Sequence, residues 1–130
     1  MDYKNLLKKA QEASQNAYAP YSDFQVGACV LAKSGKTYVG CNMENASYGL
    51  TVCAERNAIS NAIVNGEREI LAVAIWAPKM ENCLPCGACR QVIFEFQKEK
   101  ELEVISQLES NECGYEVHKI SGLLPEGFKL

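Results

Sequence analysis

The chain has 130 residues and a mass of 14.3 kDa, with 48% apolar and 22% charged residues, 9 Gly and 4 Pro. These values predict one globular domain, residues 1–130, and exclude a disordered, collagenous or coiled-coil protein. Its 13 Lys and Arg against 16 Asp and Glu give a net charge of −3, which argues against a protein that binds nucleic-acid phosphates.

No apolar run approaches the roughly 20 residues that a membrane span requires. The first residues form a polar, Lys-bearing amphipathic stretch, which is not typical of a signal peptide. We therefore expect a cytoplasmic protein that contacts neither membrane nor nucleic acid and takes a small-molecule partner.

The first third of the chain predicts a helix followed by a hairpin and a loop. Apolar residues at three- and four-residue spacing predict a helix over residues 3–18, ended by Pro20. Residues 24–31 and 37–39 predict two hairpin strands. Residues 42–50 are rich in Asn, Ser and Gly without a period, which predicts a loop that either contacts a ligand or only connects its neighbours.

A second helix is predicted to begin near Cys53, with Thr51 as its N-cap, and to end at Gly66. Residues 70–77 form a continuous apolar run, as expected of a central strand covered on both faces. Residues 83–89 are rich in Cys, Pro and Gly and predict a loop.

A third helix is predicted over residues 91–96, followed by short strands at 102–105 and 115–120. Five strands with helices for both faces of the sheet predict an α/β protein. We expect a three-layer α/β/α sandwich around a five-stranded mixed sheet.

The seven cysteines are the unusual feature of the composition. An odd number cannot all pair, and in a reducing compartment thiols bind metal or pack as small apolar groups. Cys86 and Cys89 form a Cys-x-x-Cys pair at a predicted helix start, and Cys53 opens another helix. Thiols so placed can share a tetrahedral zinc ion, and the helix dipoles lower their pKa values.

Glu55 and Arg56 lie two and three residues after Cys53 and suit a catalytic zinc site. Three protein ligands leave a fourth position for water, and a carboxylate beside that position can move protons. Three thiolates on a divalent cation carry a net charge of −1, which a guanidinium close to the ligand sulfurs would offset. Arg56 could instead be a surface or interface salt-bridge partner.

Five short stretches in this chain resemble the zinc-dependent cytidine deaminase family, in its small form with three cysteine ligands. Residues 53–55 are Cys-Ala-Glu, and residues 85–91 are Pro-Cys-Gly-Ala-Cys-Arg-Gln. Residues 24–28, 42–46 and 123–125 also resemble the family, in the same order along the chain. The resemblance covers nearly the whole chain, from about residue 18 to residue 128.

The resemblance implies hydrolytic deamination of cytidine and 2′-deoxycytidine to the uridine nucleosides and ammonia, in pyrimidine salvage. It implies zinc as the cofactor, with Cys53, Cys86 and Cys89 as its ligands. It also implies that Glu55 takes a proton from the attacking water, passes it to ring nitrogen N3, and later protonates the departing amine at C4.

The resemblance also assigns the substrate contacts. It places Phe24 against the pyrimidine ring, the Ala54 backbone on the amide edge of the base, and Asn42 with Glu44 on the ribose. Related enzymes are homotetramers whose neighbouring subunits complete each site. Tyr48 and Phe128 resemble the aromatic residues that cross between subunits.

Several other interpretations of the same residues stay open. Cys83 with the three other cysteines could form a closed, structural zinc centre, although that leaves Glu55 without a purpose. An iron–sulfur cluster lacks its fourth cysteine, because Ile93 stands at the expected position. Another aminopyrimidine nucleoside, blasticidin-like or a modified cytidine, is an alternative substrate, and a structural zinc module is an alternative class.

The remaining candidates have simpler explanations in packing. Phe24 could belong to the core, and Asn42 and Glu44 could only brace their loop. The other residues that we expect to be core, strand or incidental positions are Cys29, Cys41, Cys113, His118 and Trp76.

Overall fold

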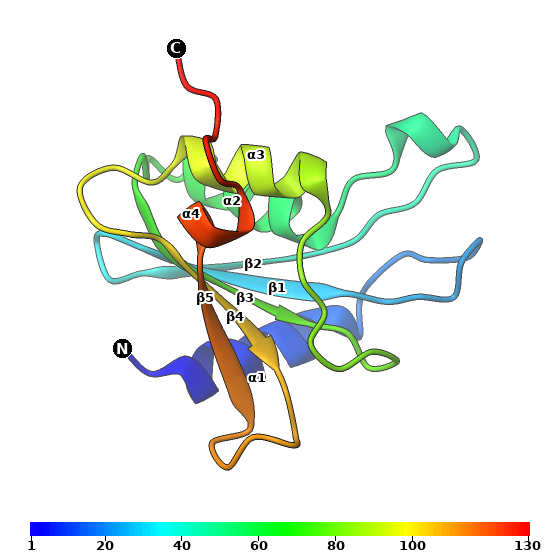
Figure 1. Ribbon diagram of the computed structural model, residues 1–130. Coiled ribbons are helices and arrows are strands. Elements are labelled where there is room, and N and C mark those ends of the chain that lie inside the picture. Colours follow the sequence, from blue (N-terminus) through cyan, green and yellow to red (C-terminus); the bar gives the residue numbers. More distant parts are fainter.

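A five-stranded sheet with the strand order β2-β1-β3-β4-β5 forms the centre of the computed structural model, which describes residues 1–130 (Figure 1). The β3–β4 pair is parallel and the other three pairs are antiparallel, so the sheet is mixed, as expected. The strands are β1 (Gly27–Ala32), β2 (Thr37–Cys41), β3 (Ile70–Trp76), β4 (Glu103–Gln107) and β5 (Tyr115–Lys119).

Helices cover both faces of the sheet, which confirms the α/β/α sandwich (Figure 1). The helices are α1 (Tyr3–Ser14), α2 (Ala54–Val64), α3 (Gly87–Glu95) and the short α4 (Ile120–Leu123), with one 3₁₀ turn at Tyr48–Leu50. Helix α1 packs on one face, and α2, α3 and α4 lie on the other. None of the helices has the length and apolar character that crossing a membrane requires.

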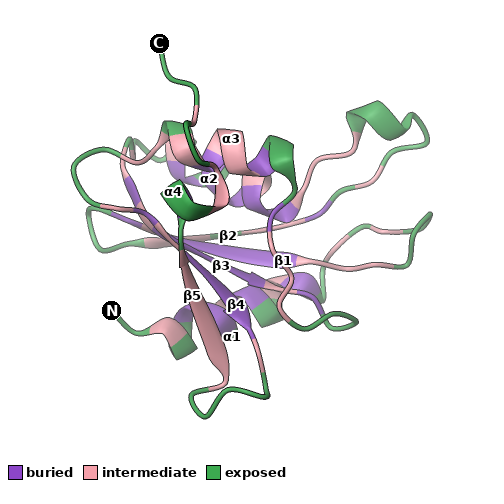
Figure 2. Ribbon diagram, viewed as in Figure 1, coloured by how far each residue is buried: buried purple, intermediate pink, exposed green.

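The sheet separates two apolar cores, and its central strands are the most buried part of the chain (Figure 2). The larger core lies beneath α2 and α3 and contains Ile59, Val73 and Ile93. The smaller core lies beneath α1 and contains Leu6 and Ile105. Because β3 contributes to both cores, its continuous apolar sequence is explained, as is its central place in the sheet.

Two glycines allow the helices to approach the sheet closely. A Cβ atom on Gly27 would lie 1.9 Å from the Ala10 carbonyl oxygen of α1, and one on Gly40 would lie 2.3 Å from the Ala58 nitrogen of α2. No side chain fits at either position. The contact at Gly40 draws α2 down onto β2 and so fixes where the N-terminus of α2 stands.

Several element boundaries differ from the sequence-based expectations. Helix α1 ends at Ser14 rather than near residue 18, because Tyr18 pairs as an isolated bridge with Met43. Strand β1 begins at Gly27 rather than at residue 24, and helix α3 begins at Gly87 rather than at residue 91. Helix α4 was not expected.

Candidate active site

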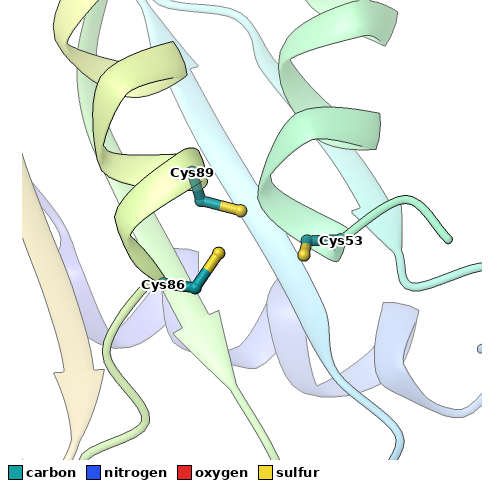
Figure 3. A group of neighbouring side chains, drawn as sticks. All are labelled: Cys53, Cys86 and Cys89. Atoms are coloured by element: carbon teal, nitrogen blue, oxygen red, sulfur yellow. The ribbon is translucent and has the colours of Figure 1, made fainter. Parts of the chain in front are cut away.

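Three cysteine side chains converge between the first turns of α2 and α3 (Figure 3). The Sγ atoms of Cys53, Cys86 and Cys89 all lie within 4.8 Å of one another. Sulfur ligands at about 2.3 Å from a zinc ion in tetrahedral geometry lie roughly 3.8 Å apart. The donor set therefore fits zinc in both chemistry and spacing, as the sequence predicts.

Cys53 and Cys86 each occupy the N-cap position of a helix, with extended backbone dihedral angles. The expected N-cap, Thr51, is wrong: it has extended backbone two residues earlier, at the end of the 3₁₀ turn. Because the backbone of Cys53 is extended, its side chain does not follow the rotation of the helix. Cys53 and Glu55 can therefore line the same pocket. The positive ends of both helix dipoles lie at the sulfur atoms, which favours thiolates.

The hydrogen bonds and charges around the sulfur atoms also change the pKa values of the thiols. Hydrogen bonding with Cys89, followed by the Arg56 guanidinium, lowers the pKa of Cys53 to about 5. The pKa of Cys89 is raised by its hydrogen bond to Cys53, by burial and by Glu55. Three thiolates this close repel one another, so all three ionise together only around a cation.

Arg56 lies where the sequence places it, beside the ligand cluster. Its Nη2 atom is 3.6 Å from Cys53 Sγ and 3.4 Å from the Thr51 carbonyl oxygen, while its Nε atom is buried without a partner. The nearby Cys53 thiolate raises the pKa of Arg56. The guanidinium thus adds positive charge on the protein side of the cluster, rather than forming a surface ion pair.

A pocket of about 280 Å³ opens against two of the three clustered cysteines, Cys53 and Cys86. Glu55 lines it with only 5% of its surface exposed, and burial raises the pKa of this carboxyl. A buried carboxyl with a raised pKa beside a metal position can accept a proton and return it. The twelve residues that line the pocket are Ser22, Phe24, Val26, Asn42, Glu44, Thr51, Cys53, Ala54, Glu55, Cys83, Leu84 and Cys86.

Asn42 joins the pocket to the segment just before strand β1 through its side-chain amide. Its Nδ2 atom donates to the Phe24 carbonyl at 2.9 Å, and its Oδ1 atom accepts from the Val26 N–H at 2.9 Å. These two bonds hold the half-buried Phe24 at the pocket wall. Asn42 therefore braces its surroundings and still lines the pocket with one N–H to spare.

Glu44 holds the neighbouring loop by a similar arrangement. Its Oε1 atom accepts from the backbone N–H groups of Tyr21 at 2.9 Å and Ser22 at 3.1 Å, and its Oε2 atom accepts from the Ser22 hydroxyl. These hydrogen bonds, above all that from the Ser22 hydroxyl, lower the pKa of Glu44. The carboxylate is thereby fixed at the pocket with one acceptor position free.

Tyr48 and Phe128 do not line this pocket within one chain. Tyr48 is 78% exposed, and its ring meets that of Tyr21 edge-on at 6.4 Å. Phe128 is 65% exposed, and its carbonyl accepts from Gln91 Nε2 at 3.0 Å. Both aromatic side chains therefore face outward.

Cys83 lines the pocket but lies outside the sulfur cluster. It packs against the larger core, and burial raises its pKa to about 11. Cys29 is fully buried and Cys113 is exposed. A closed four-cysteine centre therefore does not form in this structure.

Ser22 and Leu84 line the pocket although the sequence does not predict them there, and Arg90 makes contacts that the sequence does not predict. Ser22 lies just before the stretch 24–28, and Leu84 just before the stretch 85–91, so proximity to those motifs was the available signal. Arg90 lies within the second motif, where its Nε atom donates to the Pro85 carbonyl at 2.8 Å.

Three converging thiols, a buried carboxyl and a pocket open to both are the parts of a hydrolytic zinc site on an α/β/α fold. The family model described as "Cytidine and deoxycytidylate deaminase zinc-binding region" matches residues 1–104. The chain belongs to this family.

Individual relatives agree with the family match. A cytidine deaminase of Halalkalibacterium halodurans is 52% identical over 95 residues, which cover 73% of this chain and 72% of the relative. One of Mycoplasma genitalium is 37% identical over 126 residues, 95% of this chain and 93% of the relative. The crystal structure of cytidine deaminase from Burkholderia pseudomallei superposes with a TM-score of 0.88 at 42% identity, covering 98% of this chain and 100% of that one.

Proposed function

We propose that this protein is a zinc hydrolase that converts cytidine and 2′-deoxycytidine to uridine and 2′-deoxyuridine with release of ammonia. The observation that carries the proposal is the pocket that Glu55 shares with Cys53 and Cys86. A structural zinc site has no need of a buried carboxyl beside an accessible metal position. The relatives named cytidine deaminase support the choice of substrate.

We assign the metal to Cys53, Cys86 and Cys89, with Arg56 offsetting the charge of the three thiolates. Zinc, when bound, is a Lewis acid that lowers the pKa of water and so supplies a nucleophile near neutral pH. The protein's own part begins with Glu55, which takes the proton from the attacking water. It delivers this proton to ring nitrogen N3 as the water oxygen bonds to C4.

The second half of the reaction uses Glu55 again. The carboxylate accepts the remaining proton of the added oxygen and gives it to the exocyclic nitrogen. The C4–N bond then breaks, ammonia leaves, and a carbonyl remains at C4. Burial of Glu55 favours its protonated form, which suits a group that must hold a proton between these two transfers.

Asn42 and Glu44 form what we call the sugar end of the pocket. Their hydrogen bonds within the protein leave room to bind one hydroxyl of a nucleoside's sugar. Asn42 retains one N–H donor and Glu44 one acceptor position after their bonds to the backbone and Ser22. One donor and one acceptor match a single sugar hydroxyl. A site that reads one hydroxyl accepts ribose and deoxyribose alike, which is why we include both nucleosides.

The lining also favours a free nucleoside over a nucleotide. None of the twelve pocket residues is Lys or Arg, and the Glu44 carboxylate would repel a phosphate. We assign Phe24 to the face of the pyrimidine ring and the Ala54 backbone to its amide edge. The chain's net charge of −3 likewise disfavours nucleic acid.

We further propose that residues 1–130 form one deaminase domain that assembles as a homotetramer in the cytoplasm and serves pyrimidine salvage. The outward-facing Tyr48 and Phe128 support the assembly, because exposed aromatic side chains are typical of interfaces. In this arrangement each would reach the pocket of a neighbouring subunit.

A substrate panel tests the proposed function. Ammonia release is measured with cytosine, cytidine, 2′-deoxycytidine, their 5′-phosphates, a blasticidin-type nucleoside and single-stranded DNA. We expect the two free nucleosides to be turned over at comparable kcat/KM and the phosphates and DNA to be poor substrates. Ammonia release from the blasticidin-type nucleoside alone, or from none of them by a zinc-loaded protein, would contradict the proposal.

A further inference from the structure

One arginine joins the backbone next to a proposed zinc ligand to the C-terminal part of the fold. Arg90 Nε donates to the Pro85 carbonyl at 2.8 Å, and its Nη1 atom donates to the Leu123 carbonyl at 2.9 Å. Pro85 is buried and directly precedes Cys86. Arg90 itself follows Cys89 on helix α3.

Neither carbonyl has another hydrogen-bond donor in the structure. The Pro85 oxygen accepts no backbone N–H, since the first helical bond of α3 runs from the Arg90 N–H to the Cys86 carbonyl. The Leu123 oxygen likewise accepts only from Arg90. Loss of the guanidinium would leave a buried carbonyl unpaired beside Cys86, and hydrogen bonds from a charged donor are the stronger kind.

The far end of this bridge, helix α4, is fixed to the residues that lead into strand β4. Ile120 is fully buried, and its N–H donates to the Leu102 carbonyl at 2.9 Å. The N–H and hydroxyl of Ser121 both donate to Glu101. Helix α4 is therefore a firm anchor from which Arg90 can hold Pro85.

Cys86 is the proposed ligand that most needs such support. Cys89 is fully buried and Cys53 is half-buried, whereas Cys86 is exposed at the end of the loop from β3. Burial restrains Cys89, but the direction of the Cys86 side chain depends on the backbone that enters α3. Arg90 holds this backbone in place through its hydrogen bond to the Pro85 carbonyl oxygen.

We propose that Arg90 is a positioning residue that holds Cys86 in its place in the sulfur cluster and thereby slows the release of zinc. The proposal rests on the zinc ligands assigned above. It gives the C-terminal helix α4 an indirect part in metal retention, although no residue of α4 lies among the ligands.

The experiment measures the rate at which zinc-loaded protein releases zinc to an excess of a chromogenic chelator. We expect Arg90→Ala to release zinc about tenfold faster than the unchanged protein, and Arg90→Lys to be intermediate, because an ammonium cannot span both carbonyls. Gln91→Ala is the matched control. Its lost hydrogen bond ran to the Phe128 carbonyl rather than to Pro85, so its release rate should stay within about twofold of the unchanged protein.

Each outcome bears on a distinct claim. Release from both Arg90 variants at the rate of the unchanged protein overturns the positioning role, and so does equal acceleration in Gln91→Ala. A merely structural role would lower the midpoint of thermal unfolding without changing zinc release well below it. If Arg90→Ala does not fold, as judged by far-ultraviolet circular dichroism, Arg90→Lys decides the question.

The unchanged protein separates this proposal from the proposed function. Failure to bind one zinc per chain would overturn the ligand assignment, and this inference with it. Tight zinc binding without turnover of cytidine would overturn the proposed function alone, while the release rates of the Arg90 variants would still support or refute the positioning role.

Discussion

The two ends of the pocket are built in different ways. At the sulfur end, Cys53 and Cys86 cap two helices whose packing on the sheet fixes where those helices begin. At the sugar end, Asn42 and Glu44 stand in irregular backbone and are held by hydrogen bonds to residues about twenty positions earlier in the chain. The groups proposed to carry out the reaction therefore stand at helix starts, whereas hydrogen bonds from side chains to backbone shape the part proposed to recognise the substrate.

The difference has a consequence for mutation. In the proposed function Glu55 and the three cysteines contribute groups that react or bind metal, so their loss should abolish activity while leaving much of the fold intact. Asn42 and Glu44 use most of their hydrogen-bonding capacity within the protein. Changes to them should affect both substrate binding and the loops that form the pocket.

The largest effect is expected from removing a sulfur ligand. Cys53→Ala should lose zinc and all measurable deamination, because the two remaining thiols are too few protein ligands to hold the metal. Metal content by atomic absorption and activity on cytidine measure both. Cys83→Ala is the matched control: it should retain zinc, with unfolding free energy lowered by about 1 kcal/mol from lost packing. Loss of zinc in Cys83→Ala would instead support a structural zinc centre with four cysteine ligands.

Asn42→Ala should come next. It leaves the Phe24 carbonyl and the Val26 N–H without partners and removes the donor to the sugar, so kcat/KM should fall about 100-fold, equivalent to about 2.7 kcal/mol. Steady-state kinetics with cytidine measure this loss. Asn57→Ala is a suitable control, since Asn57 donates to the Cys41 carbonyl at 2.8 Å without lining this pocket. An equal loss in both variants would mean that Asn42 acts only through stability.

Glu44→Gln should have a smaller effect, mainly on KM. The amide oxygen can still accept from the Tyr21 and Ser22 N–H groups, but the amide nitrogen cannot accept from the Ser22 hydroxyl or the sugar. We expect KM for cytidine to rise about tenfold, or about 1.4 kcal/mol, with kcat little changed. A fall in kcat with constant KM would place Glu44 at the reacting end instead.

Tyr48→Ala should have the smallest effect on the single chain. The side chain is 78% exposed, so the unfolding free energy should change by no more than about 0.5 kcal/mol. If Tyr48 reaches a neighbouring pocket, as proposed, KM for cytidine should rise a few-fold, and sedimentation velocity shows whether the substitution changes the proposed tetramer. Unchanged KM and an unchanged assembly would show that Tyr48 does not contribute to the pocket of a neighbouring subunit.

The sequence predicted most of the metal end and less of the sugar end. Thiols at two helix starts are a local pattern, and so Cys53, Cys86, Cys89 and Arg56 could be placed together in advance. Tyr18 shows what local patterns miss, because its bridge to Met43 ends α1 early through a contact between distant residues.

The same limit applies to the pocket wall and to the helix caps. The Ser22 hydroxyl donates to Glu44, which lies 22 residues away, and no local signal marks that contact. Thr51 is a good N-cap by residue type, but it ends the 3₁₀ turn, and Cys53 is the N-cap of α2 instead. Arg90 lies within the motif at residues 85–91, yet its hydrogen bond to Leu123 depends on helix α4, which the sequence pattern does not predict.

The most direct test of the central claim compares the unchanged protein with Glu55→Gln at equal zinc content. The substitution preserves shape and removes only the ability to move protons, and conversion of cytidine is followed by loss of ultraviolet absorbance. We predict that the unchanged protein converts cytidine and that kcat falls about 1,000-fold or more in Glu55→Gln, with zinc still bound. Equal rates in the two proteins would contradict the proposed role of Glu55. No conversion by either protein would contradict the proposed deamination of cytidine.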